Sequence, residues 1–307
     1  MAQAAARRHP LFSGPFKLAK TTLSNVMVKA LVSAEDVSAS PVQAHAARLL
    51  PAAQILKPQG PGPFPVVLQM HGCGGCKPFQ RTYAESLAEA GVAAVVIDSF
   101  APRGISTVQA YATVCTGLQL WGAQRAADLF ALYAWVRAQP WADPSRILAA
   151  GWSHGGWTVM DALALPRDRL AAATGLADLP AEPLEGLAGA FLVYPYCGAA
   201  SLTARHGWRF TPKTTAIVAG RDSVVGARRP LVVLEGIQSR GGDMDVRLFP
   251  EATHAFDEPG AKDVRMSFSP ERAAQTRALL IELALSTQNT KPQDLRPQDL
   301  GPQDLRP

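Results

Sequence analysis

The sequence predicts an α/β fold, with a mostly parallel central sheet flanked by helices on both faces. Short apolar segments alternate with helix-like segments from about residue 45 to about residue 285, which is typical of an open parallel sheet. A G-x-S-x-G sequence at residues 151–155 lies between an apolar segment and a helix-like one. A (β/α)8 barrel is the alternative, but this serine turn and the spacing of the later acid and histidine disfavour it.

The expected elements follow in chain order. Residues 45–57 indicate an early strand region, where Pro51 favours an edge strand or a bulge. Residues 64–70 and 92–98 are continuous apolar runs, typical of parallel strands buried on both faces. Further strands are expected at 146–150, 188–194, 214–220 and 244–249. Helices are expected at 79–90, 120–138, 157–165, 228–239 and 270–285, and a long loop is expected at 99–116.

We expect three parts in the chain: a basic arm at 1–34, a folded domain at 35–287 and a disordered tail at 288–307. The 307 residues are 48% hydrophobic and 18% charged, which suits a globular protein with a sizeable core. In the tail, a repeat of the type Pro-Gln-Asp-Leu-Arg places a proline at every fifth position, which prevents a continuous helix. The arm has no acidic residue, and its basic residues are Arg7, Arg8, Lys17, Lys20 and Lys29.

The net charge of +5 therefore belongs to the arm, and a nucleic-acid-binding domain is not predicted. No window reaches the run of about 18 apolar residues that a membrane-spanning helix needs. We expect a cytoplasmic protein that binds neither nucleic acid nor membrane. The periplasm and secretion remain alternatives, because an acid-poor basic arm can be a targeting peptide. The sequence leaves the oligomeric state open.

Ser153 is the predicted nucleophile. A turn this tight brings backbones close together, so a side chain at either flanking glycine, Gly151 or Gly155, would collide with a neighbouring element. The helix that begins after the serine directs its free N–H groups and its positive dipole end at the same place. An ordinary glycine-rich turn is the alternative interpretation of these residues alone.

A serine hydroxyl becomes reactive when a base takes its proton and a third group orients that base. His254 follows the strand expected at 244–249, and Asp222 follows the strand expected at 214–220, so both can meet Ser153 at one edge of the sheet. A surface-loop histidine and a helix N-cap are the alternative roles of these two residues. The other candidates are His206 for the base and Asp243, Asp245 and Asp257 for the acid.

The negative oxygen that forms during acyl transfer needs N–H donors held in place. One donor is expected to be the backbone N–H of His154, the residue after the nucleophile. The other is expected from the glycine-rich loop at 71–75, where the backbone N–H of Cys73 is the candidate. A glycine-rich turn without a catalytic role is the alternative for this loop.

Together these segments resemble the dienelactone hydrolase family of the α/β-hydrolase superfamily. The resemblance covers about residues 45–285 and rests on His71-Gly-Cys-Gly-Gly75, Asp98-Ser-Phe-Ala-Pro-Arg-Gly104, Gly151-Trp-Ser-His-Gly-Gly156, Ala219-Gly-Arg-Asp222 and His254-Ala-Phe-Asp257.

This resemblance implies an α/β-hydrolase fold and hydrolysis of small esters or lactones through an acyl-enzyme, without metal or organic cofactor. The founding members use a cysteine nucleophile, and Ser153 therefore favours a general carboxylesterase. Arg103 and Trp152 are the substrate-binding candidates, with Arg103 placed to hold a substrate carboxylate. The segment between the strands at 188–194 and 214–220 is too short for a large lid. An acyl-peptide or prolyl peptidase and a non-catalytic binding protein are the alternatives.

The chain has four cysteines, and a disulfide between Cys115 and Cys197 is a hypothesis because both are expected in loops near the carboxyl edge of the sheet. Such a bond would imply an oxidising compartment. Cys73 and Cys76 form a C-x-x-C pair, which together with His71 allows a redox or a zinc-binding interpretation. Both interpretations lack the second cysteine and histidine cluster that they need.

Overall fold

The computed structural model describes residues 39–287. The predicted basic arm and repeat tail lie outside the described residues. A sheet of seven strands has the order β1-β3-β2-β4-β5-β6-β7. Strand β1 pairs antiparallel with β3, and the other neighbours pair in parallel, which confirms the predicted fold class. The strands are β1 Gln54–Leu56, β2 Phe64–Met70, β3 Ala93–Ile97, β4 Ala142–Trp152, β5 Gly189–Val193, β6 Lys213–Ala219 and β7 Met244–Phe249.

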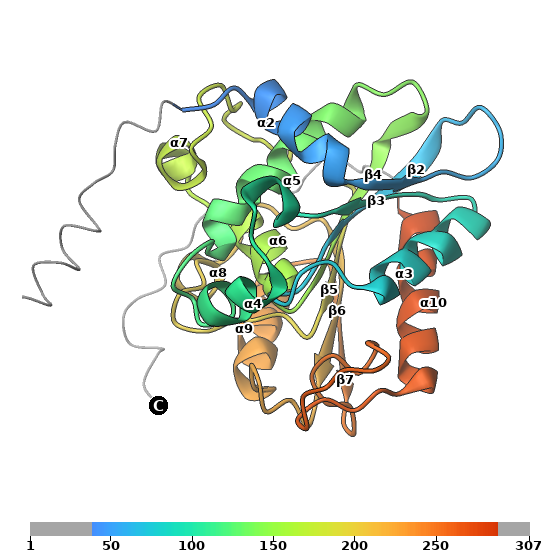
Figure 1. The fold of residues 1–307 in the computed structure, drawn as a ribbon, viewed down its shortest axis with the longest axis vertical. Coiled ribbons are helices and arrows are strands. Elements are labelled where there is room, and N and C mark those ends of the chain that lie inside the picture. The colour runs from blue at the N-terminus through green and yellow to red at the C-terminus, as the bar shows by residue number, and fades with distance from the viewer. Residues whose placement is uncertain (1–38, 288–307) are drawn as a thin grey trace, which may run out of the picture. The chain divides into compact units, whose positions relative to one another are not determined.

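Helices cover both faces of this sheet (Figure 1). The longer ones are α2 Val42–Leu49, α3 Pro78–Glu89, α5 Gly122–Arg137, α6 His154–Ala164, α9 Arg228–Ser239 and α10 Pro270–Ser286. The shorter ones are α4 Thr107–Gln109, α7 Leu170–Thr174 and α8 Thr203–His206, with 3-10 turns at Leu50–Ala52, Ala101–Arg103 and Arg167–Arg169 and a π-helical turn at Ala110–Val114.

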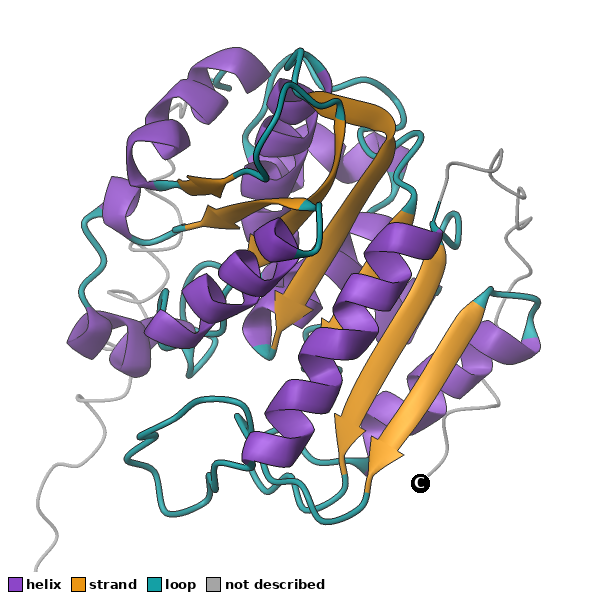
Figure 2. Ribbon diagram, turned by 90° about the vertical axis from the view of Figure 1, so that its right-hand side faces the viewer, coloured by secondary structure: helices purple, strands orange, loops and turns teal. Residues whose placement is uncertain are grey.

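The alternation of side chains along β2 shows why both faces must be covered. Val66 and Leu68 belong to the apolar cluster that the sheet shares with α2, α5, α6 and α9, whereas Val67 belongs to the cluster shared with α3 and α10. When consecutive residues of a strand are apolar, both faces of the strand carry apolar surface. This surface is fully buried only when helices pack on both faces of the sheet. Figure 2 shows α10 in front of the sheet, roughly aligned with the long strands, which run in one direction. The loops after these strands therefore gather at one edge of the sheet.

Two sequence predictions about the elements need correction. Residues 42–49 form helix α2, and only Gln54–Leu56 of the expected early strand region is a strand. His45, Ala46 and Leu49 are the buried residues of α2, and their spacing of one and three positions places them on one helical face, against α5. The segment 99–116, expected to be a loop, contains several helical turns.

Candidate active site

Ser153 lies at the sharp turn between the end of β4 and the start of α6. Its φ of 52° and ψ of −112° are unusual for a residue with a side chain, and such conformations persist only where the surroundings enforce them. A Cβ on Gly155 would overlap the Met70 carbonyl, and one on Gly151 would overlap the Gly155 carbonyl. Both glycines are therefore required by close backbone contact, as the sequence predicts.

The three side chains predicted to act together meet at this turn. His254 Nε2 lies 2.9 Å from Ser153 Oγ, and His254 Nδ1 lies 2.7 Å from Asp222 Oδ2. Asp222 follows β6 and His254 follows β7, so the parallel sheet brings residues far apart in the chain to one edge. All three are buried, with less than a tenth of each exposed. The arrangement can remove a proton from the serine hydroxyl.

Asp222 is held in its ionised form. Burial alone would raise the pKa of this carboxyl, but the hydrogen bond and charge of His254 and the backbone N–H groups of Val225 and Val224 together lower it. The carboxylate fixes the proton of His254 on Nδ1, which leaves Nε2 free to accept the serine proton. The rival base, His206, is exposed on α8, and the rival acids Asp243 and Asp245 are exposed as well.

Asp257, the third rival acid, has a different environment. Its carboxylate accepts hydrogen bonds from Tyr83, Tyr194 and the indole of Trp152, at 2.7, 2.6 and 2.9 Å. Complete burial raises its pKa, and these three donors oppose that effect. The ring of Tyr194 in turn packs 4.7 Å from that of His254. Asp257 therefore links the nucleophile turn to the histidine loop through hydrogen bonds to residues other than the triad.

The two predicted oxyanion donors lie in segments next to the serine. His154 is the first residue of α6, directly after the nucleophile. Cys73 follows β2, and its loop packs against the elbow, since a Cβ on Gly72 would lie 3.6 Å from the Cβ of Ser153. Cys73 and Ser153 line the same pocket.

This pocket has a volume of about 580 Å³ and opens over Ser153 and His254. Trp152 is among its lining residues, as the sequence predicts, although its side chain is almost fully buried. Sequence reasoning missed several others: the aromatic residues Phe79, Tyr111 and Tyr194 and the charged residues Lys77, Glu258, Lys262 and Asp263. Tyr111 lies in the segment predicted to be a loop, and the charged residues carry no motif that sequence reasoning could have found.

The structure does not place Arg103 in this pocket. Its guanidinium donates to both carboxylate oxygens of Asp128, at 2.8 and 2.9 Å, and to the Ser99 carbonyl at 2.7 Å. These partners occupy the side chain, so the expectation that Arg103 holds a substrate carboxylate is corrected. The loop position alone could not reveal this, because Asp128 comes from α5.

The predicted disulfide between Cys115 and Cys197 is wrong. Cys115 is bonded to Cys73, with Cα atoms 5.1 Å apart, while Cys197 is a buried free thiol whose Sγ lies 3.7 Å from Met160 Sδ. Cys197 follows β5 and faces the core beneath α6, whereas Cys115 follows the π-helical turn beside the Cys73 loop. The thiol of Cys76 is free and half-buried, and burial raises its pKa to about 11. The Cys73–Cys76 pair of the redox interpretation is therefore not formed.

Two further observations concern ligands and membranes. Within residues 39–287, no group of three or more histidine, cysteine and acidic side chains is arranged to hold a metal ion. None of the helices in this range is both long enough and apolar enough to cross a bilayer.

The seven-stranded sheet and the serine turn define an α/β-hydrolase. The family model of the dienelactone hydrolase family matches residues 52–285, and the chain belongs to that family. This membership supports a role as a hydrolase. No curated protein matches the chain.

Solved structures agree with this fold at low sequence identity. A putative dienelactone hydrolase from Klebsiella pneumoniae is 17% identical, with a TM-score of 0.56 over 76% of this chain and 92% of the other. Dienelactone hydrolase from Anabaena variabilis is 21% identical, with a TM-score of 0.51 over 77% and 91%. Thermogutta terrifontis esterase 2, phosphonylated by cyclosarin, is 17% identical, with a TM-score of 0.57 over 76% and 88%.

Proposed function

We propose that this chain is a serine hydrolase that cleaves small carboxylic esters or lactones through an acyl-enzyme on Ser153. The observation that carries the proposal is the continuous hydrogen-bond chain from Ser153 through His254 to Asp222, of which Ser153 and His254 line the pocket. Binding alone does not require a strained serine whose hydroxyl is hydrogen-bonded to an oriented histidine.

The proposed reaction has two steps. Ser153 Oγ attacks the ester carbonyl carbon while His254 Nε2 takes the hydroxyl proton, and the same proton then passes to the departing alcohol as the C–O bond breaks. In the second step His254 Nε2 takes a proton from a water molecule, which attacks the acyl carbon, and this proton then passes to Ser153 Oγ as the bond between Oγ and the acyl carbon breaks and the acid leaves. Asp222 keeps the imidazole in the correct tautomer and stabilises its charged form throughout.

The negative oxygen of each tetrahedral intermediate is proposed to accept hydrogen bonds from the backbone N–H groups of Cys73 and His154. His154 directly follows Ser153 at the start of α6, the loop that carries Cys73 packs against Ser153, and α6 adds the positive end of its dipole. Trp152 is proposed to form part of the substrate-facing wall, and no organic cofactor or metal takes part in these steps.

An ester is favoured over a peptide by the dimensions of the site. The connection between β5 and β6 holds only α8, so the described residues form no separate domain over the pocket that would select peptides. A cavity of about 580 Å³ accommodates a small molecule.

The test is steady-state hydrolysis of p-nitrophenyl acetate, p-nitrophenyl butyrate and a peptide p-nitroanilide. The wild type should turn over both esters and leave the anilide intact, and Ser153→Ala should lower ester kcat by a factor of about 10³ or more. Ser145→Ala, which removes an exposed hydroxyl near the start of β4, at the opposite end of the strand from Ser153, is the matched control and should behave like the wild type. Turnover of the anilide would favour the peptidase alternative, and turnover of neither would favour a binding protein.

A further inference from the structure

Arg125 is a fully buried cation in the first turn of α5, with none of its surface exposed. Removing a guanidinium from water costs several kcal/mol unless its charge and N–H groups find partners, so a fully buried arginine is rare. The sequence shows it only as one position in an amphipathic helix. Its contacts lead to the turn and loop that surround Ser153.

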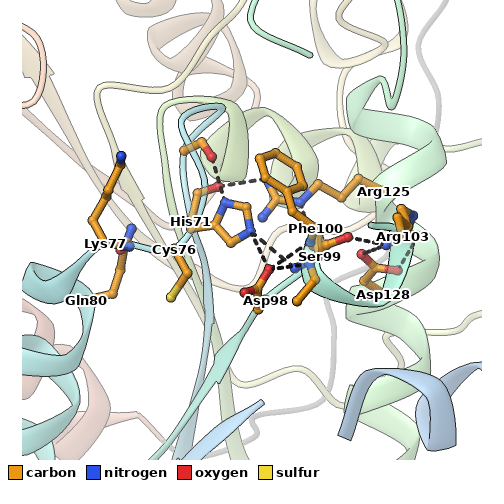
Figure 3. Close-up of polar contacts among 12 residues, drawn as sticks. His71, Cys76, Lys77, Gln80, Asp98, Ser99, Phe100, Arg103, Arg125 and Asp128 are labelled. Atoms are coloured by element: carbon orange, nitrogen blue, oxygen red, sulfur yellow. Dashed lines mark hydrogen bonds and ion pairs between the residues drawn. The ribbon is translucent and has the colours of Figure 1, made fainter. Parts of the chain in front are cut away.

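The guanidinium joins both sides of the proposed oxyanion hole. Its Nη1 donates to the His71 carbonyl at 2.7 Å, two residues before Cys73, and lies 3.3 Å from Nδ1 of His154. Its Nε donates to Ser99 Oγ at 2.8 Å. Figure 3 shows the end of Arg125 reaching toward His71, with Ser99 and Phe100 beside it. One side chain thus contacts the segments that carry each proposed donor.

The ring of His71 in turn holds the loop that carries Cys73. Ser99 N–H donates to its Nε2 at 3.2 Å, so the ring proton is on Nδ1, which donates to the Gly72 carbonyl at 2.7 Å. This hydrogen bond fixes the orientation of the peptide that links Gly72 to Cys73, whose N–H is the proposed donor. Burial and the Arg125 charge hold the pKa of His71 well below its usual value, so the ring stays neutral.

His154 is neutral for the same reasons. Burial, followed by the Arg125 charge, lowers its pKa to about 3. A neutral ring can accept a hydrogen bond at Nδ1, which faces the Arg125 Nη1. The imidazole therefore contacts the guanidinium without charge repulsion, and the start of α6 is held against the loop.

The positive charge of Arg125 is not cancelled by a contacting carboxylate. Burial lowers its pKa to about 10, so the side chain stays charged at neutral pH. None of the ion pairs among residues 39–287 includes it, because Asp128, the nearest buried acid on α5, is occupied by His45 and Arg103. A charge in this low-dielectric region acts strongly on any negative charge that forms nearby.

We propose that Arg125 is a positioning residue of the oxyanion hole, which holds the Cys73 loop and the start of α6 at the spacing that a tetrahedral oxyanion requires. The assignment rests on the proposed function. Arg125 touches neither substrate nor triad and acts through His71, Gly72 and His154. Its effect should therefore appear in the transition state and leave the binding of the ground-state ester nearly unchanged.

The test compares Arg125→Lys and Arg125→Met with the wild type and with Arg137→Met. Arg137 is the matched control, since it lies on the same helix and donates to the Glu185 carbonyl at the exposed end. Labelling with a fluorophosphonate to completion counts the competent serines in each preparation, and kcat for p-nitrophenyl butyrate is expressed per labelled site. The inhibition constant of an aryl trifluoromethyl ketone, which forms a tetrahedral adduct, reports on the oxyanion hole directly.

Per labelled site, kcat should fall about tenfold in Arg125→Lys and about 100-fold in Arg125→Met, with KM changed by less than about threefold. The ketone inhibition constant should rise by the same factors, and Arg137→Met should match the wild type. If Arg125→Met does not fold, Arg125→Lys decides alone. A lower melting temperature with unchanged kcat per site and unchanged inhibition would overturn the assignment in favour of a purely structural role. Absence of labelling in the wild type would instead contradict the proposed function, and this assignment with it.

Discussion

The disulfide between Cys73 and Cys115 gives a quantitative prediction about stability. The bond closes a loop with a sequence separation of 42 residues. In the chain-entropy description, a loop of this length restricts the unfolded chain by about 4 kcal/mol at 25 °C, and removal of such bonds typically costs about 2–4 kcal/mol. Cys115→Ser should therefore lower the free energy of unfolding in urea by about 2–4 kcal/mol.

The same bond connects a proposed oxyanion donor to the segment that contributes Tyr111 to the pocket. Loss of the bond should therefore also lower ester kcat, by up to about tenfold, because the Cys73 loop is then held by fewer contacts. Wild type treated with a reductant should behave like Cys115→Ser in both assays.

Cys76→Ser is the control, since that thiol is free and only half-buried, and its unfolding free energy should stay within about 1 kcal/mol of wild type. Thiol titration of the denatured, unreduced wild type should find two free thiols. Four titratable thiols, together with equal stability of wild type and Cys115→Ser, would refute the pairing.

Three other predictions concern the turn and the triad. In Asp222→Asn the amide cannot hold the His254 proton on Nδ1 as the carboxylate does, so ester kcat should fall by about 10³–10⁴-fold at unchanged KM; a fall below tenfold would contradict the orienting role. Because the fold lowers the pKa of Asp222 from its usual 3.8, its ionised form stabilises the protein above about pH 4, and this contribution is lost as the pH falls through the folded-state pKa. Acid titration of unfolding should therefore show the stability difference between wild type and Asp222→Asn shrinking below that range, and a difference independent of pH would contradict the shift. Gly155→Ala should lower the free energy of unfolding by about 3 kcal/mol or more, since the added Cβ would overlap the Met70 carbonyl. Gly236→Ala is the control: it lies in α9 with only the flexible end of a side chain nearby, and it should be neutral or stabilising. Similar urea midpoints for the two variants would be inconsistent with the packing of the turn.

The strands and the order of the site residues could be predicted because their signals are local. Residues 64–70 are apolar throughout, and the predicted strand at 244–249 and helix at 228–239 agree with β7 and α9 residue for residue. Parallel strands share their carboxyl edge, so residues placed after different strands could be expected to meet, and the structure brings Asp222 and His254 to Ser153. Their catalytic roles stay predictions.

The failures concern residues whose environment depends on distant parts of the chain. The segment at 42–49 is rich in the good helix formers Ala, Gln, Arg and Leu, which the strand expectation overlooked, and its helix is held by packing on α5 and by the hydrogen bond of His45 to Asp128. Arg103 turns away from the pocket toward the same carboxylate. The partner of Cys115 depended on the helical turns within 99–116, which the sequence did not reveal. The pattern of an amphipathic helix likewise gave no sign that Arg125 is buried.

Peptide-level mass spectrometry of the chain after reaction with a fluorophosphonate identifies the nucleophile without any assumption about the substrate. We expect one adduct, on Ser153, which is absent from Ser153→Ala and forms much more slowly in His254→Ala because the hydroxyl then lacks its base. An adduct on another residue, or equal labelling of wild type and Ser153→Ala, would contradict the claim that this serine is the nucleophile.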